Sequence, residues 1–160
     1  MPALTAHELR EMAMSAQEDR EAWQHLVRHD GDERVCELLH RTADAELWLV
    51  CWADGHDTGF HDHDSSTGLI AVLDGAIREE CLAIGGSPVS GIHSGGAWVT
   101  VPQGDIHRVT HVAGEPAVTL HAYSPPLERV GTYVVADDGR LRRHPAAAGE
   151  VLAADSSAKG

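Results

Sequence analysis

The stretch Gly55-His56-Asp57-Thr58-Gly59-Phe60-His61-Asp62-His63 places two histidines on either side of one aspartate. Successive side chains of an extended strand point to opposite faces, so His61 and His63 project in the same direction. Two imidazoles at this spacing can bind one metal ion from the same side. Further along, residues Gly96 to His107 follow the order G-x5-P-x-G-x2-H, in which glycine and proline fix tight turns. Histidine pairs are common on protein surfaces, so the H-x-H pair alone is weak evidence for a metal site. The second stretch strengthens that interpretation.

Together the two stretches resemble, in order and spacing, the two sequence motifs of the cupin superfamily. In cupins the first motif supplies the H-x-H pair and usually a glutamate, and the second supplies a further histidine. The resemblance implies that His61, His63 and His107 bind one divalent metal. Gly68 stands where the glutamate is expected, so the site offers three neutral nitrogen donors and no protein anion. Such donors suit iron(II) (Fe2+), with zinc, nickel and copper as alternatives.

Short apolar runs separated by turn sequences surround both motifs. Six runs rich in β-branched and aromatic residues predict strands: Leu47–Ala53, Leu69–Leu73, Ala76–Leu82, Ala97–Val101, Ala117–Tyr123 and Thr132–Val135. Dipeptides such as Asp54-Gly55 and Asp74-Gly75 punctuate them. Many short strands at this spacing predict an all-β sandwich or barrel. With the two motifs, we expect a cupin barrel, which is a double-stranded β-helix or jelly roll.

The segments that flank this pattern differ in composition. Residues 5–28 show apolar side chains at helical spacing, and Thr5 with Glu8 forms a capping box. We expect residues 1–33 to be a helical cover packed on one side of the barrel and residues 34–144 to be the cupin domain. Residues 145–160, rich in alanine, serine and glycine, are expected to be a flexible tail.

Composition excludes several classes of function. The net charge of −13 argues against nucleic-acid binding, which requires a basic face. No stretch approaches the ~18 apolar residues of a membrane span, and the first residues lack the features of a signal peptide. Three widely spaced cysteines argue against a disulfide framework. We expect a cytoplasmic protein without membrane partners, either a monomer or a weak homo-oligomer.

The segment Thr119-Leu120-His121-Ala122-Tyr123 alternates polar and apolar residues. One face of this predicted strand therefore carries Thr119, His121 and Tyr123 together. If the apolar face packs on an outer layer, the three polar side chains face the barrel interior, where they need hydrogen-bond partners. They form either a purely structural network or a set of groups that supports the metal site.

Two segments narrow the resemblance: LWLVCWADGHDTGFHDH (47–63) and GDIHRVTHVAGEPAVTLHAYSPP (104–126) closely resemble the cysteine dioxygenase family of thiol dioxygenases. This resemblance runs from about Val35 to Val130. It implies that the three histidines bind iron(II), and that Thr119, His121 and Tyr123 match a Ser-His-Tyr relay that orients the substrate. In that family a small thiol and O2 react at iron to give a sulfinic acid. A thiolate substrate would supply the anionic ligand that is missing from the protein because Gly68 replaces the usual glutamate.

Two departures from the family concern the substrate pocket. Mammalian members have, at the position of Gly68, a cysteine that is covalently linked to the tyrosine, so this chain resembles the bacterial type that lacks the Cys-Tyr crosslink. The arginine that binds the substrate carboxylate aligns near Glu37, and Arg34 and Arg41 are the nearby candidates. The expected substrate is a small carboxylate-bearing thiol, either cysteine or a related mercapto acid. The alternatives are a metal-dependent cupin of another reaction type and a non-enzymatic cupin whose metal anchors a small ligand.

The sequence predicts surface or structural positions for six other residues. We expect His56 to lie at the surface in a turn, and His93 to be solvated in a loop over residues 90–96. His111 is expected to be structural, because glycine and proline on both sides argue against a zinc-binding helix. Trp48, Trp52 and Trp98 fall in predicted strands and are expected to be core residues.

Overall fold

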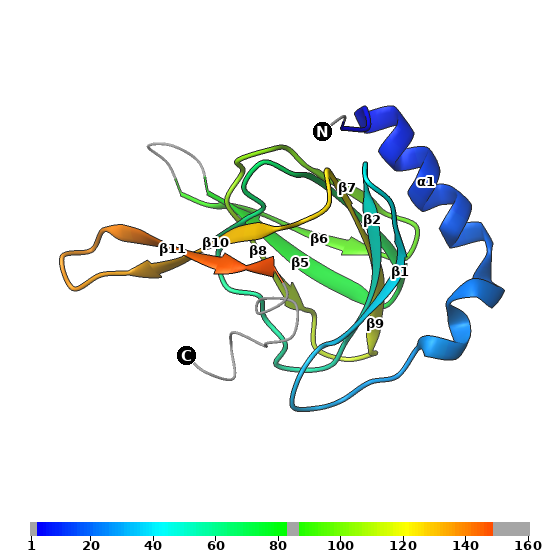
Figure 1. Cartoon of the computed structure of the whole chain (residues 1–160). Helices are drawn as coiled ribbons and strands as arrows, with labels where there is room; N and C mark the ends of the chain where they lie inside the picture. Colours follow the sequence, from blue (N-terminus) through cyan, green and yellow to red (C-terminus); the bar gives the residue numbers. More distant parts are fainter. Residues whose placement is uncertain (1–2, 83–86, 149–160) are drawn as a thin grey trace.

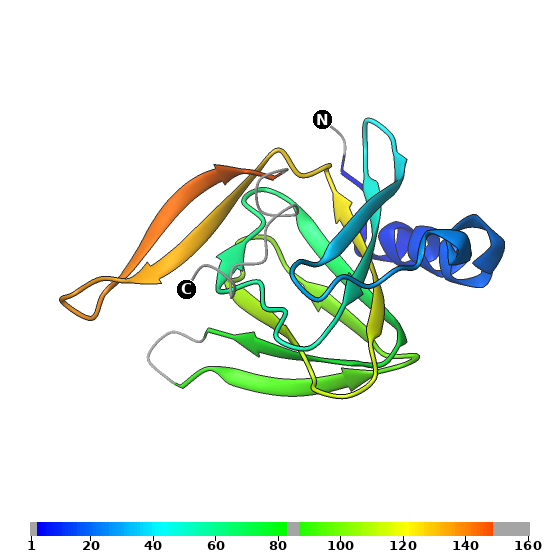
Figure 2. The same ribbon diagram turned by 90° about the horizontal axis from the view of Figure 1, so that it is seen from below.

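Two antiparallel sheets face one another in the computed structural model, which describes residues 3–82 and 87–148 (Figures 1 and 2). The first sheet contains, in spatial order, β1 (Val35–Arg41), β2 (Glu46–Trp52), β9 (Ala117–Ser124), β4 (Thr67–Asp74) and β7 (Trp98–Val101). The second contains β11 (Leu141–Ala147), β10 (Arg129–Val135), β3 (His61–Asp62), β8 (His107–His111), β5 (Ala76–Cys81) and β6 (Val89–Ser94). The prediction of an all-β barrel is confirmed.

The helix α1 (Ala6–Glu18) lies on the outside of the first sheet (Figure 1). Its capping box is formed as expected: the Glu8 N–H donates to the Thr5 hydroxyl, and the Thr5 N–H donates to the Glu8 carboxylate. Two short 3-10 turns follow, η1 (Arg20–Ala22) and η2 (Gln24–Leu26). No helix in the described part of the chain has the length and apolar character needed to cross a membrane.

Both faces of the first sheet are covered, which explains why all eight residues of β9 are buried. On the outer face Leu120 and Ala122 pack in one cluster with Leu9 and Ala13 of α1. The inner face carries a second apolar cluster that includes Val50, Trp52, Ile70 and Val109. The polar residues of β9 alternate with the apolar ones and therefore face the barrel interior. The orientation of β9 predicted from its sequence is confirmed.

Two segments differ from their expectations. His93 lies on β6 (Val89–Ser94), where the sequence predicted a loop. The strand β11 continues to Ala147, and the N–H of the buried Ala148 donates to the Glu128 carbonyl at 3.2 Å. Residues 145–148 therefore belong to the fold rather than to the expected flexible tail. The rest of that segment, 149–160, lies outside the described residues.

Candidate metal centre

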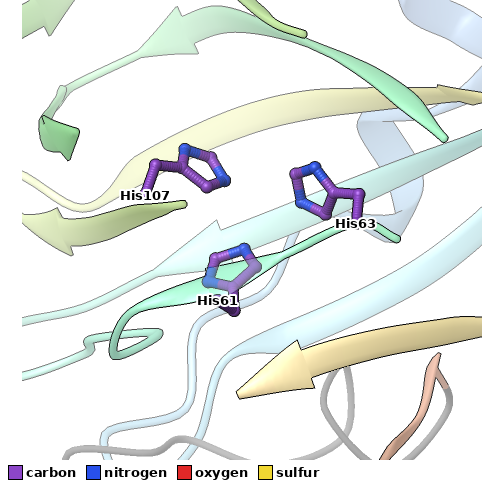
Figure 3. A group of neighbouring side chains, drawn as sticks. All are labelled: His61, His63 and His107. Carbon is purple, nitrogen blue, oxygen red and sulfur yellow. The ribbon is translucent and has the colours of Figure 1, made fainter. Parts of the chain in front are cut away.

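Neighbouring strands of the second sheet carry the three histidines selected from the sequence. His61 begins β3, His63 follows it, and His107 begins β8, where it is the register partner of His61. One ring nitrogen from each histidine lies within 4.8 Å of those of the other two. Figure 3 shows the three rings converging on one point between the strands. All three residues are buried, His61 at 6%, His63 at 3% and His107 at 1% exposure.

Hydrogen bonds on the far side of two rings orient them. The Nδ1 of His61 donates to the Gly59 carbonyl at 3.0 Å, and the Nδ1 of His107 donates to the Glu79 carboxylate at 2.9 Å. An imidazole whose Nδ1 carries the hydrogen has its lone pair on Nε2. The His107 Nε2 is buried and has no hydrogen-bond partner among the described residues. A buried lone pair of this kind fits a metal ligand.

Burial also favours the uncharged state of the histidines that a metal requires. Desolvation, with a smaller contribution from the neighbouring His107, lowers the pKa of His61 to about 3. Desolvation likewise lowers the pKa of His63 well below its ordinary value, with His61 as the next cause. The two rings are therefore neutral at physiological pH, and protons do not compete with a metal for them.

Gly68 lies beside both a histidine and the tyrosine of the expected relay. A Cβ at this position would lie 3.3 Å from the His63 Nδ1 and 3.3 Å from the Tyr123 Cε1. Within the described residues, the group of convergent donor atoms contains only the three histidines. The site therefore has a neutral nitrogen face, and it carries no thiol next to Tyr123 at Gly68.

A chain of buried hydrogen bonds runs along the inner face of β9 toward the histidines. The Thr119 hydroxyl lies 2.7 Å from the His121 Nε2, and the His121 Nδ1 lies 3.2 Å from the Tyr123 hydroxyl. Burial lowers the pKa of His121 to about 3 and raises the pKa of Tyr123 above its ordinary value. The ring centres of Tyr123 and His63 are 4.9 Å apart. The relay expected from the sequence is thus formed geometrically and stays uncharged.

Trp52 is the start of this chain, a role that the sequence analysis missed. Trp52 lies at the end of β2, the neighbour of β9 in the first sheet, and its Nε1 donates to the Thr119 hydroxyl at 2.9 Å. An alternating strand sequence reveals which residues share a face, whereas it contains no sign of a partner 67 positions away.

Of the two candidate arginines, Arg34 lies in the metal cavity. Arg34 is 7% exposed, and together with the three histidines, His121 and Tyr123 it lines a cavity of about 30 Å³. Its guanidinium carbon is 5.3 Å from the centre of the Trp52 ring. The cavity also contacts Ala148, so the end of β11 forms part of its wall.

Arg41 and Glu37 lie elsewhere. The Arg41 side chain is 52% exposed, its Nε is 3.6 Å from the Glu46 carboxylate, and it lines a different cleft of about 620 Å³ next to Pro125. The Glu37 carboxylate accepts a hydrogen bond from Arg28 at 3.1 Å and does not line the metal cavity. Of the two arginine candidates, Arg34 therefore lines the cavity and Arg41 does not. Glu37 also lies outside the cavity, so its negative charge would not repel a substrate carboxylate there.

Asp62, between the two histidines of the H-x-H pair, anchors the C-terminal hairpin to the metal centre. Its carboxylate accepts hydrogen bonds from the Arg143 Nε at 2.8 Å, the Tyr133 hydroxyl at 2.5 Å and the Gly131 N–H at 3.1 Å. Burial raises the pKa of Asp62, but the hydrogen bonds from Arg143 and Tyr133 outweigh it and hold the pKa below its ordinary value. A Cβ at Gly131 would overlap the Arg143 guanidinium, so a larger residue there would displace the Arg143 side chain from its present position on Asp62.

Two further histidines were assigned structural or surface positions. The surface position expected for His56 is wrong: the residue is 2% exposed, and its Nδ1 accepts a hydrogen bond from the Ala53 N–H at 2.9 Å. His111 is structural as predicted, because its Nε2 donates to the Glu115 carbonyl at 2.7 Å and its Nδ1 lies 3.0 Å from Asp54.

Solved structures with a similar fold include a cupin superfamily protein and a protein with a double-stranded β-helix domain. A conserved protein with a double-stranded beta-helix domain from Klebsiella pneumoniae has a TM-score of 0.56 at 17% identity, covering 64% of this chain and 80% of that one. A cupin superfamily protein from Desulfitobacterium hafniense has a TM-score of 0.55 at 14% identity, covering 64% and 87%. At this level of identity the likeness shows the fold alone, which is the cupin fold.

Sequence comparisons identify the family. Cysteine dioxygenase type 1 of Danio rerio is 27% identical over 143 residues, which are 82% of this chain and 71% of that protein. The Homo sapiens protein of the same name is 30% identical over 92 residues, and the match covers 51% of this chain and 46% of the human one. The chain thus matches less than half of the human relative's length. The sequence model of the family described as cysteine dioxygenase type I matches residues 2–135. This chain belongs to the cysteine dioxygenase type I family.

Proposed function

We propose that this protein is an iron(II)-dependent thiol dioxygenase that converts a small carboxylate-bearing thiol, cysteine or a related mercapto acid, and O2 into the corresponding sulfinic acid. Both oxygen atoms of O2 form bonds to sulfur as the O–O bond breaks. The sulfur loses four electrons and O2 gains them, so no further reductant is needed. The observation that carries the proposal is the buried face of three histidines next to Tyr123 and Arg34, with no acidic ligand among the described residues.

The donor set supports a metal that accepts an anionic substrate. His61, His63 and His107 would hold it, and bound iron(II) would supply the redox-active centre at which a thiolate and O2 react. Zinc fits the same three nitrogens but has no redox chemistry. The cavity of about 30 Å³ has room for only one or two water molecules. A bulky substrate would therefore require a larger rearrangement of the cavity walls than a small one.

Arg34 is our candidate for binding the substrate carboxylate. Its guanidinium is permanently charged, and its planar fork matches a carboxylate with two parallel hydrogen bonds. Contact with the Trp52 ring on one side orients the guanidinium within the cavity wall. A substrate held at both its carboxylate and its sulfur would have one defined orientation toward Tyr123.

Tyr123 is our candidate for holding a proton beside the reacting sulfur and oxygen atoms. Trp52 can only donate a hydrogen bond, so the Thr119 oxygen accepts from it. A Thr119 hydroxyl that then donates to the His121 Nε2 leaves the His121 Nδ1–H to donate to the Tyr123 oxygen. In this arrangement the Tyr123 O–H is directed into the cavity. Its raised pKa keeps the proton on the hydroxyl at neutral pH.

An oxygen-electrode screen tests the proposal. Anaerobically purified protein loaded with iron(II) is supplied with cysteine, 3-mercaptopropionate, mercaptosuccinate and, as a matched control without a carboxylate, cysteamine. We expect O2 uptake and sulfinate, detected by mass spectrometry, with at least one carboxylate-bearing thiol and little uptake with cysteamine. Absence of uptake with all three carboxylate-bearing thiols contradicts the proposal.

Other outcomes of the same screen identify the alternatives. Zinc or nickel in the isolated protein, with no thiol-dependent O2 uptake, would favour a metal-dependent cupin of another reaction type. Thiol binding without turnover, unchanged in Tyr123→Phe, would favour a ligand-binding cupin.

A further inference from the structure

Glu79 is the one buried acidic residue of the described chain that has no lysine or arginine nitrogen within 4.0 Å. The other two are Glu46, which has the Arg41 Nε at 3.6 Å, and Asp62, which has the Arg143 Nε at 2.8 Å. A buried carboxylate without a cation is unfavourable, because burial removes the water that stabilises its charge. The position of Glu79 therefore needs an explanation other than an ordinary ion pair.

Two histidines are the polar neighbours of the Glu79 carboxylate. The Glu79 Oε2 accepts a hydrogen bond from the His107 Nδ1 at 2.9 Å, and its Oε1 lies 4.0 Å from the His93 Nε2. On the far side of the same ring, the His107 Nε2 is buried and has no partner among the described residues. The strand register explains the contact, because β5 and β8 are neighbours and Glu79 pairs with Val109, two residues from His107. A metal bound to the His107 Nε2 would place a positive charge on the opposite side of the same ring from the Glu79 carboxylate.

We infer that Glu79 is a positioning residue of the metal centre. It holds His107 in the tautomer whose Nε2 binds the metal. It also places a negative charge behind that ligand, in a site where Gly68 replaces the usual acidic ligand. A carboxylate hydrogen-bonded to a metal-binding imidazole fixes the ring and makes its other nitrogen a stronger donor. Because Glu79 is not itself a ligand, the coordination positions opposite the histidines stay open. The inference rests on the proposed metal site and extends it, and it does not depend on which thiol is the substrate.

The central variant is Glu79→Gln, whose amide oxygen can still accept from the His107 Nδ1 but carries no charge. The control is Glu80→Gln, which makes the same change at the adjacent residue, whose side chain points to the opposite face of β5. Cobalt(II) is the probe, titrated into metal-free protein against a competing chelator. His107→Ala defines the fraction of binding that belongs to the three-histidine site.

Two readouts of opposite sign separate positioning from general structural support. We expect Glu79→Gln to weaken cobalt(II) binding by about tenfold or more and to shift the cobalt(II) absorption bands. The melting temperature of the metal-free variant should stay the same or rise, because a buried charge without a cation has been removed. The iron(III)/iron(II) potential of the variant should be higher than that of the wild type, since a negative charge near the metal stabilises the oxidised state. Glu79→Asp, which keeps the charge at a longer distance, should give intermediate cobalt(II) affinity.

The outcomes that overturn the inference are distinct from those that overturn the proposed function. Cobalt(II) affinity and absorption bands in Glu79→Gln that match those of Glu80→Gln would show that Glu79 has no role at the metal. A lowered melting temperature of metal-free Glu79→Gln, with unchanged affinity, would show a structural role alone. If Glu79→Gln does not fold, a wild-type spectrum in Glu79→Ala or an affinity in Glu79→Asp equal to wild type overturns the inference. If wild-type protein and His107→Ala bind cobalt(II) equally, the proposed metal site itself fails.

Discussion

Replacing Arg143 by leucine tests whether the C-terminal hairpin anchors the H-x-H pair. Arg143 lies on β11 and donates to the Asp62 carboxylate from Nε at 2.8 Å and from Nη2 at 3.0 Å. Asp62 is 5% exposed and separates His61 from His63. The variant removes the only cation that binds this carboxylate among the described residues, while the hydrogen bonds from Tyr133 and Gly131 remain.

The magnitude follows from the two hydrogen bonds and their exposure to water. Hydrogen bonds to charged groups contribute about 1.5–3 kcal/mol each. The Arg143 side chain is 36% exposed, so solvent screens the pair and replaces part of the lost interaction. We therefore expect the free energy of unfolding of the metal-free protein to fall by about 2 kcal/mol in total. In a domain of this size that corresponds to a melting temperature lower by about 6 °C.

Differential scanning calorimetry of the metal-free protein measures this change, with Arg142→Leu as the matched control. Arg142 is the neighbouring residue on β11, its side chain is 63% exposed, and its Nη2 lies 3.8 Å from Asp138. The control should lower the free energy of unfolding by less than about 0.5 kcal/mol. Cobalt(II) affinity should fall in Arg143→Leu and stay unchanged in Arg142→Leu, since the former alone loosens the strand between the ligands. Equal effects of the two variants would refute the idea that this ion pair supports the metal site.

Three further predictions concern the cavity. His63→Ala should abolish stoichiometric iron binding, measured by elemental analysis; iron retained at the wild-type level would exclude His63 as a ligand. Tyr123→Phe should keep its iron and lose about 100-fold or more in turnover, measured with the oxygen electrode; loss of iron instead would show that Tyr123 supports the site structurally. Arg34→Gln should raise KM for a carboxylate-bearing thiol by about 30-fold, because losing a charge-assisted hydrogen-bonded pair costs about 2 kcal/mol. Arg41→Gln is the control and should leave KM unchanged. Equal KM values for these two variants would exclude Arg34 as the carboxylate anchor.

Local patterns in the sequence were sufficient for the strands and for the side-chain directions that build the site. The alternation in Thr119–Tyr123 correctly predicted an inner polar face, because a two-residue period is a property of any strand. The spacing of His61 and His63 likewise fixed their common direction. The burial of β9 on its outer face depends on α1, which is distant in the sequence and packs Leu9 and Ala13 against Leu120 and Ala122.

The parts that could not be predicted depend on contacts between distant residues. Arg143 and Asp62 are 81 positions apart, and Glu79 and His107 are 28 apart, so neither pair produces a local pattern. The strand β11 ends in Pro145 and alanines, which have low strand propensity. It forms because β10 pairs with it along its whole length. The alanine-rich composition that suggested a frayed tail was therefore outweighed by tertiary pairing.

The shortness of β3 has a consequence for the order in which the site is assembled during synthesis. This strand has two residues, and its neighbours in the sheet are β8 on one side and β10 on the other. All three histidines have been synthesised by residue 107, whereas β10 begins at Arg129 and the arginine that binds Asp62 is residue 143. A nascent chain on the ribosome therefore contains every candidate ligand before it contains the strands that hold two of them in place. The arrangement of His61 and His63 is therefore complete only after β10 and Arg143 have been added to the chain.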